Sequence, residues 1–267
     1  MPDLADDGIY IASESTFYRV LKESNQQHHR GRGRIPQKRT VSGHYAIKAN
    51  QVWSWDITWL PGPAKGLFFY LYLIVDIFSR KITGWEIYDC ESSKHASEVV
   101  LRAALSERLN GIPLILHSDN GSPMKGSSLL VTLNNLGIEP SYSRPQVSND
   151  NPYSESLFRT LKYRPAYPYQ GFSDIEKARD WVHQFVRWYN GEHRHSGLNF
   201  ITPNQRHQGL DVEIMEKRQT VYEAAKSIHP ERWSGNIRNM TLPKGVWLNP
   251  PSKNSSKLKT ERNAKKP

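Results

Sequence analysis

Two neighbouring stretches, residues 53–59 and 67–78, most constrain the fold because their apolar patterns differ. From Trp53 to Trp59 apolar and polar residues alternate, which is the period of a strand with one buried face. Residues 67–78 are almost wholly apolar, as expected for a central strand covered on both faces. The alternation places Asp56 on the face opposite the tryptophans. A chain with these two strands is expected to build a sheet with a buried layer on each side.

The segments that follow predict a mixed α/β fold. A turn at Pro61-Gly-Pro63 separates the first two strands, and helix stop signals such as Asn110-Gly111 and Gly137 separate later elements. Asn151-Pro152 predicts a helix start with Asn as N-cap, and Ser173-Asp-Ile-Glu176 predicts a capping box. The expected order is strand 81–88, helix 93–109, strand 112–116, helix 128–136, strand 138–142, then helices. This α/β order, three strands leading into helix–strand alternation, is also that of the ribonuclease H-like mixed sheet flanked by helices.

Charge and composition narrow the class of partner. The 267 residues carry a net charge of +10, with basic runs near both ends. Residues 24–55 contain no Asp or Glu, and the last 24 residues hold seven Lys or Arg against the single Glu261. Such basic flanks favour nucleic acid as a partner, although solubilising tails are the plain alternative. The single Cys90 excludes an internal disulfide, and no signal peptide or membrane span is present, so we expect a cytoplasmic, nucleoid-associated protein.

Four parts are expected along the chain. Residues 1–23 form a short N-terminal helical segment, in which Ser13 caps a helix over 14–22. Residues 24–49 form a basic linker, 50–210 the main domain, and 211–267 a helical extension ending in a basic, disordered tail. The linker supplies five candidate DNA contacts: Arg30, Arg32, Arg34, Lys38 and Arg39.

Three acidic residues are the candidate catalytic and metal-binding set. Asp56 lies on the first strand, Asp119 just past a strand end, and Glu155 in a first helical turn. Carboxylates far apart in sequence can converge on Mg²⁺, which binds a few such oxygens plus substrate phosphates. Two ions would serve phosphoryl transfer, with Mn²⁺ as a substitute. Without metal, the three charges would repel and raise one another's pKa.

Nearby residues could contact DNA. Glu155, Arg159 and Lys162 share one side of a helix, so that face carries an acid for metal and two cations for phosphate. An ordinary solvated face is the alternative. Asn120 follows Asp119 in a tight turn that would let a backbone approach closely, and is a further candidate DNA contact. His117 is expected to be structural.

The sequence resembles the DDE transposases of the insertion-sequence-three type and, more distantly, retroviral integrases. The resemblance covers about residues 1–208. The residues that carry it are Asp56, His117-Ser-Asp-Asn-Gly-Ser122, Asn151-Pro-Tyr-Ser-Glu-Ser-Leu-Phe-Arg-Thr-Leu-Lys162, Trp188-Tyr-Asn190, Arg194-His-Ser-Gly-Leu198 and Thr202-Pro203. It implies a metal-binding triad of Asp56, Asp119 and Glu155, a DNA-contacting Lys162, and strand cleavage and strand transfer at the ends of a mobile element, without a covalent enzyme–DNA intermediate.

The resemblance also implies partners. Residues 12–19 look like the second helix of the family's N-terminal helix-turn-helix segment, whose first helix is mostly missing, so we expect a chain truncated at its front. The implied partners are element and target DNA, a separately encoded helix-turn-helix protein, and further copies of this chain on DNA. Two alternatives stay open: a ribonuclease H-like or structure-specific nuclease, and an inactive DNA-binding remnant.

Overall fold

The computed structural model describes residues 6–24, 43–109, 111–144 and 150–250, and divides the chain into two compact units, Met1–Thr40 and Val41–Pro267. In the first unit, α2 (Glu14–Glu23) begins as expected, because the Ser13 side chain accepts a hydrogen bond from the Thr16 backbone N–H. The tail from residue 251 onward lies outside the described residues. So do five candidate DNA contacts of the linker: Arg30, Arg32, Arg34, Lys38 and Arg39.

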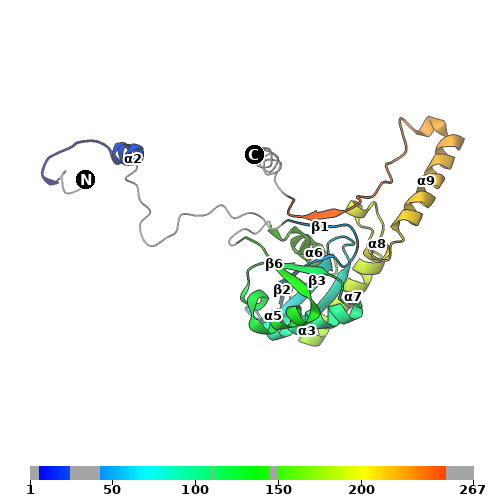
Figure 1. The fold of residues 1–267 in the computed structure, drawn as a ribbon, viewed down its shortest axis with the longest axis horizontal. Helices are drawn as coiled ribbons and strands as arrows, with labels where there is room; N and C mark the ends of the chain where they lie inside the picture. The colour runs from blue at the N-terminus through cyan, green and yellow to red at the C-terminus, as the bar shows by residue number, and fades with distance from the viewer. Residues whose placement is uncertain (1–5, 25–42, 110, 145–149, 251–267) are drawn as a thin grey trace, which may run out of the picture. The chain divides into compact units, whose positions relative to one another are not determined.

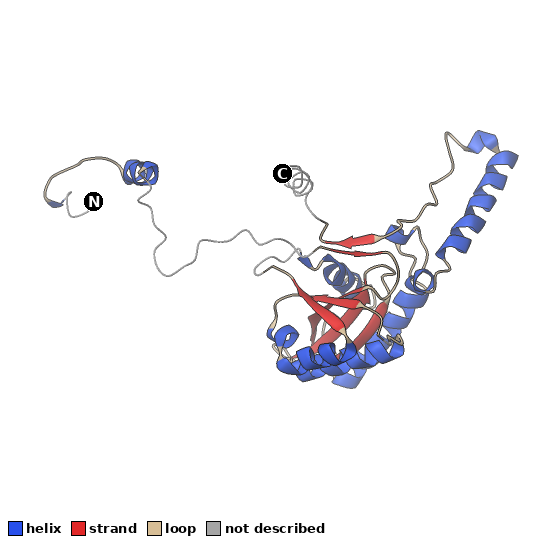
Figure 2. Ribbon diagram, viewed as in Figure 1, coloured by secondary structure: helices blue, strands red, loops and turns tan. Residues whose placement is uncertain are grey.

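A five-stranded mixed sheet forms the centre of the second unit, in the order β4-β3-β2-β5-β6 (Figures 1 and 2). The strands β2, β3 and β4 are antiparallel neighbours, whereas β5 and β6 run parallel to β2. The meander and the two crossovers are therefore confirmed. The strands are β2 (Val52–Pro61), β3 (Phe68–Asp76), β4 (Ile82–Tyr88), β5 (Leu114–Ser118) and β6 (Ile138–Tyr142).

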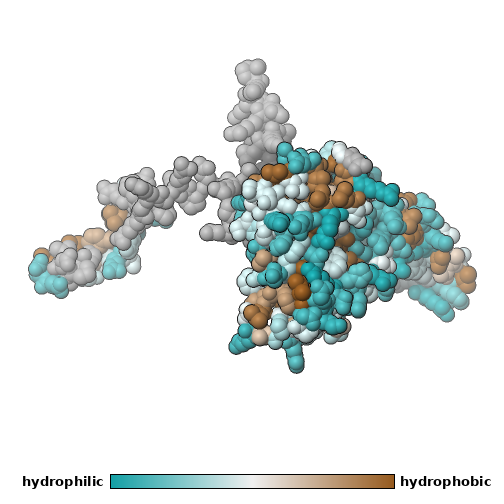
Figure 3. All heavy atoms as spheres, turned by 90° about the horizontal axis from the view of Figure 1, so that it is seen from below, coloured by the Kyte–Doolittle hydropathy of each residue, from teal (hydrophilic) through white to brown (hydrophobic). Residues whose placement is uncertain are grey.

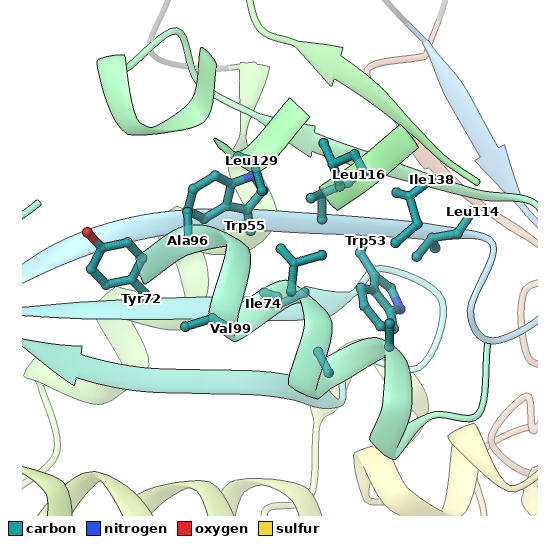
Figure 4. Packing of buried hydrophobic residues seen from close by; sticks show 14 of the residues in the cluster. Trp53, Trp55, Tyr72, Ile74, Ala96, Val99, Leu114, Leu116, Leu129 and Ile138 are labelled. Carbon is teal, nitrogen blue, oxygen red and sulfur yellow. The ribbon is translucent and has the colours of Figure 1, made fainter. Parts of the chain in front are cut away.

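One face of the sheet is covered by α3 and α5. Trp53 and Trp55 of β2 point to this side and are almost wholly buried, together with Tyr72 and Ile74 of β3 (Figure 4). The residues of α3 that pack against them, among them Ala96 and Val99, are small or branched, which lets the helix lie close to the sheet. The helices on this side are α3 (Ser93–Ser106), the short α4 (Ser122–Lys125) and α5 (Ser127–Leu136).

The opposite face is covered by α6 and α7. The alternate residues of β3, Leu71, Leu73 and Val75, pack here against Leu157 of α6 and Phe185 of α7. Both faces of β3 are therefore buried, and this explains why its sequence is apolar without alternation. The helices of this layer and beyond it are α6 (Pro152–Lys162), α7 (Ile175–Gly191), η2 (Ser196–Leu198), α8 (Pro203–His207), α9 (Asp211–Ile228) and η3 (Pro230–Arg232).

A two-stranded ribbon joins residues from far apart in the sequence. β1 (His44–Ala46) pairs antiparallel with β7 (Val246–Leu248), and Tyr45 packs against Trp247 with ring centroids 4.8 Å apart. Ala46 and Leu248 are buried beside Val52 of β2. Residues 44–46 were expected to belong to the linker over 24–49, and the ribbon was not foreseen, because three-residue strands carry too few residues to show a period.

Some local expectations differ from the structure. The helix expected over 93–109 ends at Ser106. The strand expected at 112–116 lies at 114–118, so Asp119 follows its last residue directly. The helix expected to start with Ser173 as cap has Asp174 as its N-cap instead, whose carboxylate accepts from the Lys177 N–H at 2.8 Å. Carboxylates and hydroxyls both accept this bond, so sequence alone did not separate the two neighbours.

The surface of the molecule is mainly hydrophilic on the face in Figure 3, with apolar patches between the polar side chains. Among the described residues, no helix combines the length and apolar character that crossing a membrane requires.

Candidate active site

Asp56 lies in the middle of β2, which is paired along β3 on one side and with β5 on the other. Its side chain is on the face opposite Trp55, as the alternation predicts, because Ser54 on the same face contacts Ser154 of α6 with the hydroxyl oxygens 2.8 Å apart. One carboxylate oxygen of Asp56 accepts the backbone N–H of Ile57 at 2.8 Å. A central strand holds this acid more rigidly than a loop would.

Asp119 is brought beside Asp56 by the register of the parallel pair. Ser54 is paired with His117, and two further residues along each strand lead to Asp56 and Asp119. The turn after β5 is tight: the Asp119 Oδ1 accepts the Gly121 N–H at 3.0 Å. A Cβ at Gly121 would lie 2.9 Å from the Met124 sulfur and 3.2 Å from the Asp119 Oδ1, so a larger residue here would have to displace the Met124 side chain.

Glu155 is positioned by hydrogen bonds between the start of α6 and β2. The buried Asn151 accepts a hydrogen bond from the Ser54 hydroxyl and donates to the Trp55 carbonyl oxygen at 3.1 Å. Asn151 is thus the N-cap residue, with Pro152 next as expected, but its side chain bonds to the strand and makes no cap. Glu155 directly follows Ser154 of α6, whose hydroxyl contacts that of Ser54, and it is close enough to Asp56 to raise the pKa of that carboxyl.

Burial and like charges perturb these acids. Burial raises the pKa of Asp56 to about 7, and the charge of Asp119 is the next largest cause. The hydrogen bond from the Ile57 N–H opposes this shift. The charges of Glu155 and Glu91 add smaller contributions to it. Burial also raises the pKa of Glu155. The expected mutual repulsion is therefore present at Asp56, and desolvation adds a larger effect to it. A cation bound beside these carboxyl groups would favour their ionised forms and offset the cost of burying the charges.

The donor set fits a divalent cation that keeps several waters. No ion pair with Asp56, Asp119 or Glu155 occurs in the described part of the chain, so their charges are uncompensated. The oxygens of these three acids are not all within 4.8 Å of one another. The ligand atoms of Asp89, Cys90 and His95, of which the first two are exposed, do lie that close together. Three spaced carboxylates suit Mg²⁺ or Mn²⁺ shared with substrate oxygens better than a closed protein cage.

The candidate DNA contacts beside the acids differ in their surroundings. Arg159 is exposed on α6, and Lys162 is half-buried, which lowers the pKa of its ammonium group. Neither forms an ion pair with a described residue, so both remain available for phosphate. Asn120 donates its amide to the Ser143 carbonyl oxygen, which anchors the turn after Asp119 to the end of β6. Its role as a DNA contact stays a prediction.

His117 has a structural role, as expected. The ring is fully buried and bonds to the Ser141 hydroxyl at 3.0 Å and to the Asp150 carbonyl oxygen at 3.1 Å, and burial lowers its pKa to about 4. It thereby ties β5 and β6 to the segment that enters α6.

Ser54 and Glu91 were not identified from the sequence, and Asn151 was identified only as a helix cap and as part of a motif. Glu91 accepts from the Trp59 indole N–H at 2.9 Å and is close enough to raise the pKa of Asp56. Ser54 could have been suspected from the alternation, since it must share the face of Asp56. Nothing in the sequence distinguishes Asn151 as a strand contact from Asn151 as a helix cap.

The raised pKa of Asp56 predicts a pH-dependent stability. Because this carboxyl binds its proton more tightly in the folded than in the unfolded chain, the free energy of unfolding should fall as pH rises from about 4 to about 7. We expect Asp56→Asn to raise the melting temperature in EDTA at pH 8 by several degrees, at about 2–4 °C per kcal/mol, and to change it little at pH 4. Differential scanning fluorimetry at both pH values measures this. The exposed Asp180→Asn is the control, and an equal gain at both pH values would contradict the assignment.

Comparisons with known proteins agree with the fold. A family model described as an integrase core domain matches residues 46–148, and a second model of the same description matches residues 136–203. One chain in the cryo-EM structure of the simian T-cell lymphotropic virus intasome in complex with PP2A regulatory subunit B56 gamma superposes with a TM-score of 0.52. It is 20% identical, and the match covers 73% of this chain and 67% of that one. The expected ribonuclease H-like fold is thereby confirmed.

Two curated relatives are transposases. Over 159 residues the chain is 33% identical to the transposase for insertion sequence element IS904 of Lactococcus lactis, which covers 59% of this chain and 61% of the relative. Over 162 residues it is 29% identical to transposase InsF for insertion sequence IS3A of Escherichia coli, which covers 60% of this chain and 55% of that protein. The chain thus spans about three fifths of the length of these relatives. These matches show that residues 46–203 resemble integrase core domains and that the chain is similar, over about three fifths of its length, to transposases of insertion sequences.

Proposed function

We propose that this chain is the catalytic part of a transposase that cuts DNA strands at the ends of a mobile element and joins them to target DNA. The observation that carries the proposal is the set of three uncompensated carboxylates, Asp56, Asp119 and Glu155, held by β2, by the end of β5 and by α6 around one region of the sheet. The transposase relatives support the same reaction class.

The three acids would hold Mg²⁺ or Mn²⁺, as a pair of ions. Bound there, the ions supply activation of the attacking oxygen and relief of negative charge on the phosphoryl group and the leaving oxygen. In cleavage, water attacks phosphorus and the bond to the 3′ oxygen breaks, leaving a 3′-hydroxyl and a 5′-phosphate. In joining, that 3′-hydroxyl attacks a target phosphodiester, and the target's own 3′ oxygen leaves.

The protein's own groups would position the DNA. Arg159 and Lys162 lie on the side of α6 that carries Glu155 and can each bind a backbone phosphate. The Asn151 contacts with β2 keep Glu155 at a fixed place relative to Asp56. The rigid sheet therefore sets the geometry, and α6 delivers both an acid and two cations to it.

The flanking segments would help to bind DNA. Residues 1–23, with α2, are proposed as part of a helix-turn-helix segment, residues 24–49 as a basic linker, residues 50–210 as the catalytic core, and residues 211–267 as a helical extension with a basic tail. The proposed partners are element ends and target DNA in the nucleoid, a separately encoded helix-turn-helix protein, and further copies of this chain on DNA.

A strand-transfer assay tests the proposal. The protein is incubated with Mn²⁺ and either a labelled DNA duplex ending in the element's inverted repeat or a labelled RNA–DNA hybrid of the same sequence. Nicked DNA and longer joined products from the duplex support the transposase. Cleavage of only the RNA strand would favour a ribonuclease H. DNA binding without any product would favour an inactive remnant.

A further inference from the structure

A second site of interest lies behind α6, away from the three acids. A cavity of about 520 Å³ is enclosed by the turn between β3 and β4, the first turns of α6, the segment after α7, and β7. The side chains that characterise it are Arg80, Tyr153, Ser156, His195 and Trp247. Tyr153 and Ser156 lie on a different side of α6 from Glu155, Arg159 and Lys162.

Arg80 brings into this cavity a positive charge that forms no ion pair in the described part of the chain, although Asp76 lies near enough to favour it. Its guanidinium lies 4.0 Å from the centroid of the Tyr153 ring, and its buried Nε has no hydrogen-bond partner in the described part of the chain. The nearby Asp76 carboxylate already accepts from Asn50 and from Ser79. Burial lowers the pKa of Arg80, which still stays cationic at neutral pH. A desolvated guanidinium with unused donors favours an anionic ligand.

The backbone at Arg80 supports a specific role for this side chain. Arg80 has a φ of +68°, a left-handed conformation that glycine or asparagine adopts more readily. The β3–β4 turn requires it, since the Arg80 N–H bonds to the Asp76 carbonyl oxygen at 2.8 Å. A left-handed backbone conformation is strained for arginine. In this fold it places the Arg80 guanidinium inside the cavity.

His195 adds a second unused polar group. Its Nδ1 is buried without a hydrogen-bond partner in the described residues. Burial, then the charges of Arg80 and His193, lower its pKa to about 4, so the imidazole is neutral at pH 7. A neutral imidazole can still donate one N–H to an oxygen of a bound anion without adding charge.

Aromatic side chains line the rest of the cavity. Tyr153, Tyr189 and Trp247 contribute rings, and the Tyr153 hydroxyl donates to the Trp247 carbonyl oxygen at 2.7 Å, which holds the ribbon over α6. Trp247 is 43% exposed, and its ring also contacts Tyr45. A cation beside an aromatic ring is a combination by which proteins hold nucleic acid strands, with phosphate on the cation and sugar or base on the ring.

We propose that this cavity is a second DNA-contact site, in which Arg80 and His195 hold one backbone phosphate and the adjoining nucleotide lies against Tyr153 and Trp247. The inference rests on the proposed function in taking DNA as the ligand, but it uses none of the three acids. DNA held here and along Arg159 and Lys162 would contact two sides of α6, and would thereby position the strand that reaches Glu155.

Metal-free DNA binding tests the site. Fluorescence anisotropy of a labelled duplex in EDTA, over a series of salt concentrations, compares wild type with Arg80→Gln and with Ser156→Glu. Ser156 is exposed on α6, so the glutamate adds a negative charge beside the cavity without disturbing the core. Ser128→Glu is the matched control, because Ser128 is also exposed and its carbonyl oxygen likewise accepts a threonine hydroxyl one turn on.

The expected result is weaker binding by about tenfold for Arg80→Gln, with the slope of log affinity against log salt reduced by about 0.9 for the lost phosphate. Ser156→Glu should weaken binding severalfold, and Ser128→Glu should leave it unchanged. The inference would be overturned if Ser156→Glu and a folded Arg80→Gln both bind DNA with wild-type affinity and with the wild-type salt dependence. A second result would also overturn it. If inorganic phosphate stabilises the wild-type protein against unfolding, and Arg80→Gln abolishes that stabilisation without changing DNA affinity, the cavity holds a free anion and not DNA.

The failure of this inference can be told from failure of the proposed function. If wild type cuts and joins DNA with Mn²⁺ but the cavity variants bind as wild type does, only the second contact site is wrong. If no variant of the three acids changes DNA processing while Arg80→Gln loses affinity, the catalytic assignment is wrong and the contact site stands.

Discussion

Asp119→Asn is expected to lower the rate of metal-dependent DNA strand cleavage by at least about 10³-fold, while leaving metal-free DNA binding unchanged. The loss follows because a metal ligand at the reacting phosphate contributes several kcal/mol of transition-state stabilisation, at about 1.4 kcal/mol per tenfold in rate. The turn should survive, since an asparagine Oδ1 can still accept the Gly121 N–H that Asp119 now binds. Single-turnover cleavage of a labelled duplex with Mn²⁺ measures the rate.

Asp89→Asn is the matched control for this experiment. Asp89 is exposed and belongs to the trio with Cys90 and His95, the described residues whose ligand atoms lie closest to a metal-binding arrangement. If that trio held the catalytic metal, Asp89→Asn would abolish cleavage and Asp119→Asn would not. The opposite result is expected, because Asp56 senses the charge of Asp119 through a raised pKa.

Asn151→Ala is expected to lower both stability and activity. The substitution leaves the buried Trp55 carbonyl oxygen without its Asn151 donor and removes one partner of the buried Ser54 hydroxyl, which should cost about 2–3 kcal/mol. At about 2–4 °C per kcal/mol the melting temperature should fall by about 4–12 °C. Release of the helix start from β2 would also let Glu155 move, and a displacement of about 1 Å can cost about 10²-fold in rate.

Thermal unfolding and single-turnover cleavage below the melting temperature separate the two effects of Asn151→Ala. The control is Asn135→Ala on α5, an exposed position where the change should stay within about 0.5 kcal/mol. If Asn151→Ala unfolds at the wild-type temperature and cleaves at the wild-type rate, the contact with β2 does not position Glu155, and another contact of α6 must do so.

The catalytic assignment and the sheet were accessible from sequence to different degrees. Period-two alternation around Trp53 and Trp55 was sufficient to place Asp56 on the opposite face, and this is confirmed by the contact of Ser54 with α6. The strand before Asp119 was predicted two residues too early, because its last two residues, His117 and Ser118, are polar in sequence yet buried within the strand. The ribbon of β1 and β7 was missed, since pairing between residues about 200 apart leaves no local pattern.

The sequence by itself determined the fold class and singled out the three candidate acidic residues, because apolar periodicity and short motifs are local properties of the chain. Only the tertiary structure decided how those acids are held and how strongly they are perturbed. The register of β2 with β5, the bonds of Asn151 to β2, and the burial that raises the pKa of Asp56 to about 7 all depend on contacts between segments distant in sequence. The cavity around Arg80 is of the same kind, since its walls come from a turn, two helical regions and a terminal strand that meet only when the chain is folded.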